Sequence, residues 1–168
     1  EAEQTSYTLR SSFFYRVHHI WPDLIQKLEA IKAMPLNWQP KHELGISDVA
    51  WNRAQKEEVS PAEVFCNPTL IKTEPALIAY YRCLALLPQK GTQRLLSSTK
   101  EFEDGSRTKL QDDQALNLAS IFNQLVSLLI ESDTKWSLEK ARIAALLNLG
   151  TQINGSWRNE IGSEGSRK

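Results

Sequence analysis

The sequence predicts an all-α fold, arranged as a single domain over residues 1–168. Apolar residues recur every three or four positions along most of the chain, which is the spacing of one face of an α-helix. No segment has the pattern of a convincing β-strand, and no internal repeat is present. With 168 residues, 41% of them hydrophobic, the chain can bury a full-sized core. We therefore expect a single compact bundle of six to eight helices around a central helix near residues 113–131.

In the N-terminal part, the helical spacing of apolar residues extends over residues 9–33. Pro22 interrupts this run, so it either kinks the helix or starts a new helix in its first turn. Residues 34–40 contain two prolines and predict a loop that packs over the core. Ser47 then has the position of an N-cap for a short helix that ends near Lys56.

Prolines delimit the helices in the middle of the chain. Residues 60–63, Ser-Pro-Ala-Glu, have the capping-box pattern with proline at the first helical position, and predict a short helix to about residue 67. Pro75 lies in the first turn of the next helix, and Pro88 stops it. Residues 89–97 are then long enough for one more short helix.

The helical pattern lapses after residue 98 and resumes at residue 112. Asp104-Gly105 is a turn signal within this stretch, so we expect either a short β-hairpin or a loop at 100–109. The longest helix follows and ends near Glu131, and we expect Asp112 or Asp113 to cap it. Its apolar residues cover nearly all sides, which is typical of a central helix surrounded by neighbours.

The last strong helix begins after Ser137, which has the position of its N-cap, and extends to Gly150. From Thr151 onward, apolar residues at a spacing of four indicate a frayed helix.

Residues that could carry catalysis or bind a metal are sparse. His18 and His19 are adjacent, so on a helix they face about 100° apart and cannot share a metal ion. Metal-dependent nucleases need two acids and a lysine that converge at a strand, where the bound ions activate water. Asp133-Thr-Lys135 is the only acid-x-Lys match, and it lies at a helix–helix junction. The sequence therefore predicts no catalytic residue, no metal site and no cofactor in this chain.

The two cysteines, Cys66 and Cys83, lie in apolar surroundings and are expected to be buried free thiols. Because they give no disulfide framework, and no signal peptide is visible, we expect a cytoplasmic protein. No apolar run is long enough to predict a membrane span, so we expect no membrane partner.

Twenty basic and twenty acidic residues give a net charge of zero, so bulk charge does not favour a polyanionic partner. Five basic residues nevertheless fall within twenty positions, beside two glutamines whose amides can read base edges or phosphate oxygens. Glu101, Glu103 and Asp104 dilute this charge, and a solvated surface of mixed charge is the alternative. The residues in question are Gln89, Lys90, Gln93, Arg94, Lys100, Arg107 and Lys109.

Three short motifs carry a resemblance to a known family. They are Val-Phe-Cys-Asn-Pro at 64–68, Tyr-Tyr-Arg at 80–82 and Pro-Gln-Lys-Gly at 88–91. The segment from Leu44 to Lys168 thereby resembles the N-terminal helical region of type II restriction endonucleases of the XamI-like kind. The sequence departs from that pattern at Asn67, where the family has histidine.

This resemblance implies that the chain is the N-terminal fragment of a longer, DNA-hydrolysing enzyme of a restriction–modification system. The catalytic core, with its Mg²⁺, would then lie beyond Lys168, and this chain would be a non-catalytic domain that binds double-stranded DNA. Gln89, Gln93 and Arg107 would be the first candidates for contact with base edges. Phosphates would be neutralised by the basic residues, Lys90, Arg94, Lys100, Arg107 and Lys109. Tyr80, Tyr81 and Arg82 would brace the helix behind this surface.

A second hypothesis is a helical protein-interaction or dimerisation domain with no role in nucleic-acid binding. Large aromatic side chains concentrate in the N-terminal part of the chain and could anchor a partner or a second copy in a homodimer. The proposed anchors are Phe13, Phe14, Trp21, Trp38 and Trp51.

Overall fold

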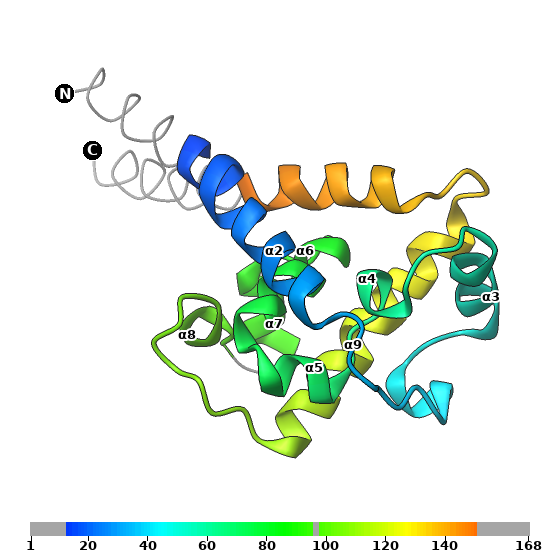
Figure 1. Ribbon diagram of the computed structural model, residues 1–168, viewed down its shortest axis with the longest axis horizontal. Helices are drawn as coiled ribbons and strands as arrows, with labels where there is room; N and C mark the ends of the chain where they lie inside the picture. Colours follow the sequence, from blue (N-terminus) through cyan, green and yellow to red (C-terminus); the bar gives the residue numbers. More distant parts are fainter. Residues whose placement is uncertain (1–12, 96–97, 151–168) are drawn as a thin grey trace, which may run out of the picture.

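The computed structural model describes residues 13–95 and 98–150, and within these ranges it is helical and contains no strand (Figure 1). The all-α prediction is therefore confirmed. In chain order the elements are η1 (Arg16–Ile20), α2 (Trp21–Ile31), η2 (Lys41–Leu44), α3 (Asp48–Lys56), α4 (Pro61–Val64), α5 (Pro68–Thr73), η3 (Pro75–Leu77), α6 (Ile78–Leu84), α7 (Gln89–Leu95), α8 (Lys100–Glu103) and α9 (Asp112–Ser132). A further helix occupies residues 138–150, drawn in orange in Figure 1.

Helix α9 is the central helix, as the sequence predicts. It crosses the molecule diagonally, and α3, α5 and α6 pack on it (Figure 1). Its length and hydropathy would suffice to cross a membrane, but core helices of soluble proteins share these properties. Two apolar side chains of α9, Leu116 and Leu128, face solvent, so the helix is covered on fewer sides than its sequence suggests. Its buried apolar face consists of Ala115, Leu118, Ala119, Phe122, Val126 and Ile130.

A buried asparagine in the middle of α9 fixes two loops on the core. The side-chain oxygen of Asn123 accepts a hydrogen bond from the Cys66 backbone N–H at 2.7 Å. Its amide nitrogen donates to the carbonyls of Leu44 and Cys66, both at 2.8 Å. Because these backbone groups are out of reach of water, each needs a protein partner. One side chain therefore satisfies three backbone groups on two loops that are distant in sequence.

The loop after Leu44 approaches α9 so closely that position 45 requires glycine. Gly45 has φ +79°, and a Cβ at this position would lie 2.2 Å from the carbonyl oxygen of Ser120 on α9. Next to it, the backbone N–H of Ser47 donates to the hydroxyl of Ser127 on α9 at 3.2 Å. Ser47 also caps α3 as predicted, since its hydroxyl accepts from the Ala50 N–H at 3.1 Å.

Three local predictions need correction. Ser60 precedes α4, but its side chain makes no capping bond, and the Glu63 carboxylate instead accepts from Lys32 Nζ at 2.8 Å. Gln111, rather than an aspartate, caps α9 through a capping box with Gln114. Of the two alternatives for residues 100–109 the hairpin is wrong, because the segment starts with the one-turn helix α8 and continues as a loop.

Two helix boundaries also differ from the prediction. The short helix expected to reach about residue 67 ends at Val64, and a separate helix, α5, begins at Pro68. Helix α6 ends at Leu84, so the turn at 85–87, rather than Pro88, stops it.

The predictions for Pro22 and for the two cysteines agree with the structure. Pro22 lies in the first turn of α2, which continues from the π-helical turn η1. Cys66 and Cys83 are buried free thiols, and burial raises the pKa of Cys83 to about 11 and that of Cys66 well above its usual value. The tail from Thr151 lies outside the described residues.

We predict that Asn123→Ala lowers the free energy of unfolding by about 3 kcal/mol, because three buried backbone groups lose their partner at once. Urea denaturation followed by circular dichroism measures this change. Gln124→Ala is the matched control, since Gln124 is exposed and, among the described residues, its side chain bonds only to Ser120 of its own helix. Equal stability of the two variants would contradict the role assigned to Asn123.

Candidate nucleic-acid interface

The Tyr80-Tyr81-Arg82 sequence of α6 is fully buried, and its two tyrosines secure α4. The Tyr80 hydroxyl donates to the carbonyl of Glu63 at 2.5 Å, and the Tyr81 hydroxyl donates to that of Ala62 at 2.7 Å. These carbonyls belong to a helix of four residues, whose own backbone leaves them without intrahelical partners. Burial raises the pKa of Tyr80 to about 12 and that of Tyr81 well above its usual value, so both hydroxyls remain donors at neutral pH.

Arg82 forms a buried ion pair with Glu103 of α8. Its Nε lies 2.9 Å from Glu103 Oε2, and its Nη2 lies 2.8 Å from Oε1. The side chains of Arg82 and Glu103 are 0% and 8% exposed, so water does not screen the pair. Gln89 Nε2 donates to the same carboxylate at 3.2 Å, and the Thr99 hydroxyl donates to it as well. The Glu103 carboxylate therefore joins α6, the start of α7 and α8.

The electrostatics of this cluster favour the ionised pair. Burial opposes the charged form of Arg82, but the hydrogen bonds and charge of Glu103 outweigh it, so the pKa of Arg82 is raised. Arg16 of η1 lies close enough to Arg82 and Glu103 for their charges to affect its pKa. Burial lowers the pKa of Arg16, against the opposing effect of Glu103. The Glu103 carboxylate therefore compensates the buried charge of Arg82 and acts on Arg16 as well.

Arg82 also fixes the turn that leads from α6 into α7. Its Nη1 donates to the carbonyl of Leu87 at 2.8 Å, while its own carbonyl accepts from the Leu87 N–H at 3.1 Å. The Leu86 N–H donates to the Cys83 carbonyl at 3.0 Å, which completes a Schellman motif. Leu86 takes the left-handed position of this motif with φ +55°, where glycine is favoured. The direction of α7 is therefore set by Arg82 and by a strained leucine.

The candidate DNA-contacting residues lie on α7, on α8 and in the loop that follows α8; we call residues 89–109 the cationic segment. Among the described residues, its five basic side chains form no ion pair with the protein, and all five are exposed. Arg107 lies over the ring of Phe102, with its guanidinium carbon 5.1 Å from the ring centre. Six of the seven candidate residues face solvent, namely Lys90, Gln93, Arg94, Lys100, Arg107 and Lys109.

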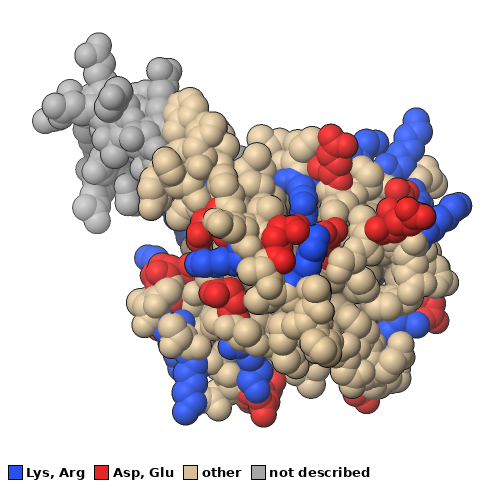
Figure 2. All heavy atoms as spheres, in the orientation of Figure 1, with Lys and Arg blue, Asp and Glu red and all other residues tan. Residues whose placement is uncertain are grey.

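The acidic residues of the cationic segment differ in their binding partners and in their exposure to solvent. Glu103 is occupied by Arg82, and the Asp104 carboxylate accepts from the backbone N–H of Ser106 at 2.8 Å. Glu101 and Asp104 are the two exposed acids, against five exposed cations. On the face drawn in Figure 2, basic and acidic atoms are interspersed over the whole surface. The positive charge of the segment is therefore local and modest.

Some functional contacts are absent from the sequence-based prediction. Glu103 enters that prediction only as a diluting charge, whereas the structure makes it the centre of the polar cluster. Gln89, a candidate for base contact, is half-buried and donates its amide to Glu103. Asn67, the departure from the family motif, caps α5 by accepting from the Thr69 N–H at 3.0 Å. No local spacing signals the pairing of Arg82 with Glu103, because 21 positions separate them.

A comparison with protein families finds a match over residues 54–168, to the family model described as XcyI restriction endonuclease. The matched range covers more than half of the chain and includes Arg82, Gln89, Thr99 and Glu103. No curated protein and no solved structure matches the chain.

We predict that Arg82→Met lowers the free energy of unfolding by about 3–5 kcal/mol, because it leaves the Glu103 carboxylate buried without its cation. The double variant Arg82→Met with Glu103→Leu should lose less, since neither charge then remains in the core. Arg107→Met, an exposed arginine of the same region, serves as control in the same urea denaturation experiment. A double variant that is less stable than Arg82→Met would show that the pair is not coupled in this way.

Proposed function

This chain belongs to the XcyI restriction endonuclease family, and on that premise we propose that it binds double-stranded DNA through the cationic segment. The family match confirms the relation to type II restriction endonucleases, and it identifies the XcyI family where the motifs pointed to the XamI-like kind. Enzymes of this kind act on duplex DNA, whose phosphates attract lysine and arginine. The proposal assigns that contact to particular residues.

One observation carries the proposal. The exposed basic side chains of the cationic segment have no ion-pair partner within the described chain, while the central acid between them, Glu103, is neutralised by Arg82. Basic side chains that form no ion pair are available to phosphates, and their binding releases counterions from the duplex. Lys90, Arg94, Lys100 and Lys109 are thus the proposed phosphate contacts.

The buried cluster has a positioning role in this proposal. Glu103 holds α8 against α6 and receives Gln89 from α7, so the two cationic helices keep a fixed relative position. Gln93 and Arg107 are the proposed base-edge contacts, because both are exposed and carry several hydrogen-bond donors. Gln89 would have to leave Glu103 to contact a base, so it belongs to the positioning cluster instead.

The described residues do not offer a site for the Mg²⁺ expected of a parent nuclease. Ranges 13–95 and 98–150 contain no group of three or more histidine, cysteine, aspartate or glutamate side chains that could hold a metal. The Asp133 carboxylate accepts from the backbone N–H of Lys135 at 2.9 Å, within a turn between two helices. We therefore assign DNA binding, and no hydrolytic step, to this part of the enzyme, and we place its action in the cytoplasm, where restriction enzymes meet DNA.

The alternative function, an interaction domain anchored by N-terminal aromatic residues, is less well supported. Trp21 is buried and stacks on Tyr80, with 5.6 Å between ring centres. Trp38 and Trp51 are half-buried and pack on each other and on the core. Of the proposed anchors, Phe14 is exposed and could reach a partner. Most of these rings therefore stabilise the chain itself.

We predict that the chain retards duplex DNA in mobility-shift experiments at low salt, and that Lys90→Ala with Arg94→Ala weakens this binding. Two lost phosphate contacts should make the slope of log affinity against log salt shallower by about 1.8. Lys56→Ala with Lys135→Ala is the matched control, since both lysines are exposed and lie outside the cationic segment.

Absence of duplex binding at low salt would refute the proposed function. Equal salt slopes for the two double variants would instead show that DNA meets another surface.

A further inference from the structure

Arg107 differs from the other basic residues of the cationic segment because an aromatic ring of the protein holds its charged group. Its guanidinium carbon lies 5.1 Å from the ring centre of Phe102, and a cation in this position is attracted to the ring. Phe102 is 2% exposed, so the ring is a fixed part of the core. Within residues 13–95 and 98–150, the other four basic side chains of the segment lie over no ring.

The backbone around Arg107 is held in place as well. The Arg107 N–H donates to the carbonyl of Glu101 at 3.0 Å, which folds the loop back onto α8. Between these residues, the Asp104 N–H donates to the carbonyl of Lys100 at 2.9 Å, and the Asp104 carboxylate accepts from the Ser106 N–H at 2.8 Å. The position of Arg107 is therefore fixed at both ends of the residue, by its backbone and by its guanidinium.

The hydrogen-bond donors of the Arg107 side chain remain unused. The side chain is exposed, and within the described ranges it makes no hydrogen bond and no ion pair. A guanidinium carries five N–H donors in one plane and no acceptor. These donors are therefore available to a ligand that offers two acceptors side by side.

We propose that Arg107 recognises guanine in the major groove of the bound duplex, and that Phe102 positions it for this contact. Because it names the base that the cationic segment contacts, this inference rests on the proposed function. Guanine presents two acceptors, O6 and N7, on its major-groove edge. Adenine presents one acceptor and one donor, thymine one acceptor beside a methyl group, and cytosine a donor. A side chain that has only donors is therefore matched best by guanine.

A phosphate also offers acceptors to arginine, but it explains the arrangement less well. Phosphate oxygens lie on the outside of the duplex, so flexible side chains such as Lys90 and Lys109 reach them without a fixed orientation. The acceptors of a base edge lie in one plane within a groove, and bidentate contact with them requires a guanidinium of defined orientation. Fixing the side chain in advance also lowers the entropy lost on binding. The contact with Phe102 is therefore of more use to base recognition than to phosphate contact.

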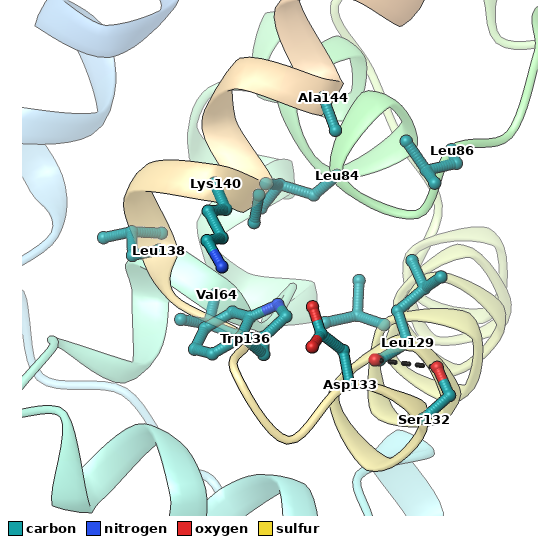
Figure 3. Close-up of a pocket in the computed structure, with 12 residues that line it drawn as sticks. Val64, Leu84, Leu86, Leu129, Ser132, Asp133, Trp136, Leu138, Lys140 and Ala144 are labelled. Carbon is teal, nitrogen blue, oxygen red and sulfur yellow. Dashed lines mark hydrogen bonds between the residues drawn. The ribbon is translucent and has the colours of Figure 1, made fainter.

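The cavity beside Trp136 is separate from this contact. It has a volume of about 180 Å³ and lies between the end of α9 and the helix at 138–150, where apolar side chains form most of its lining (Figure 3). None of the seven candidate DNA-contacting residues lines it. The Asp133 carboxylate and the Lys140 ammonium beside it carry opposite charges. The assignment of guanine to Arg107 therefore does not depend on this cavity.

The first test selects, with the full chain, the duplexes that bind from a pool with a randomised central segment. We expect the unaltered chain to enrich guanine at a position where Arg107→Ala shows no preference, whereas the preferences at other positions persist in this variant. Arg94→Ala is the matched control, since Arg94 is an exposed arginine that we assign to a phosphate. This control should weaken binding and keep the preference for guanine.

The second test replaces the selected guanine by 7-deazaguanine, which lacks the N7 acceptor but keeps the base pair and the phosphates. We expect the unaltered chain to bind this duplex about tenfold more weakly, and Arg107→Ala to bind both duplexes equally. Phe102→Leu keeps an apolar side chain in the core and removes the ring, so in folded protein it should reduce the tenfold difference. Since Arg107 is exposed, Arg107→Ala remains informative if Phe102→Leu fails to fold.

Duplex binding without a preference for guanine, or a preference that Arg107→Ala retains, would overturn the inference and leave the proposed function intact. If Arg107→Ala retains the preference and makes the salt slope shallower by about 0.9, Arg107 contacts a phosphate instead, which likewise overturns the inference. Absence of duplex binding at low salt would refute the proposed function and, with it, the inference.

Discussion

Arg82 and Glu103 meet in a part of the protein from which water is excluded, and three helices are oriented by that contact. A buried ion pair contributes little net stability, because desolvation of both charges offsets their attraction. Its geometry is nevertheless exacting, since two parallel hydrogen bonds and two further donors converge on one carboxylate. The main role that we assign to the Arg82–Glu103 pair is therefore to set the positions of α7 and α8 relative to α6.

Two of the three motifs that carry the family resemblance belong to the scaffold, whereas the third, Pro-Gln-Lys-Gly at 88–91, contributes Gln89 to the scaffold and Lys90 to the proposed DNA-contacting surface. Consecutive side chains of α6 extend to different elements, because successive helical positions point about 100° apart. Tyr80 and Tyr81 hold α4, whereas Arg82 holds α8 and the turn into α7. The exposed lysines and arginines are then presented on segments that the motif positions. A motif can thus mark a family through its packing while the contacts with the ligand come from residues around it.

The sequence was sufficient to predict the helices whose ends or positions are determined by neighbouring residues in the chain. Ser47 caps α3, Pro22 opens α2, and the apolar period of α9 identifies the central helix. It could not predict contacts that depend on the path of the chain. Asn123 reaches Cys66 over 57 positions, and Arg82 reaches Glu103 over 21, so neither pairing leaves a periodic signal. Of the two alternatives for residues 100–109, the sequence could not exclude the hairpin for a related reason: Asp104-Gly105 does form a turn, but no strand flanks it in the described part of the chain.

The affinity of Glu103→Gln for duplex DNA, compared with that of Glu101→Gln, tests the central claim most directly. Each change removes one negative charge from the cationic segment, so electrostatic attraction alone would make both variants bind more tightly. If the carboxylate of Glu103 positions the two cationic helices, Glu103→Gln should bind more weakly than the unaltered chain, by about tenfold, whereas the exposed Glu101→Gln should bind at least as tightly. Equal strengthening by both changes, in variants that circular dichroism shows to be folded, would contradict the account.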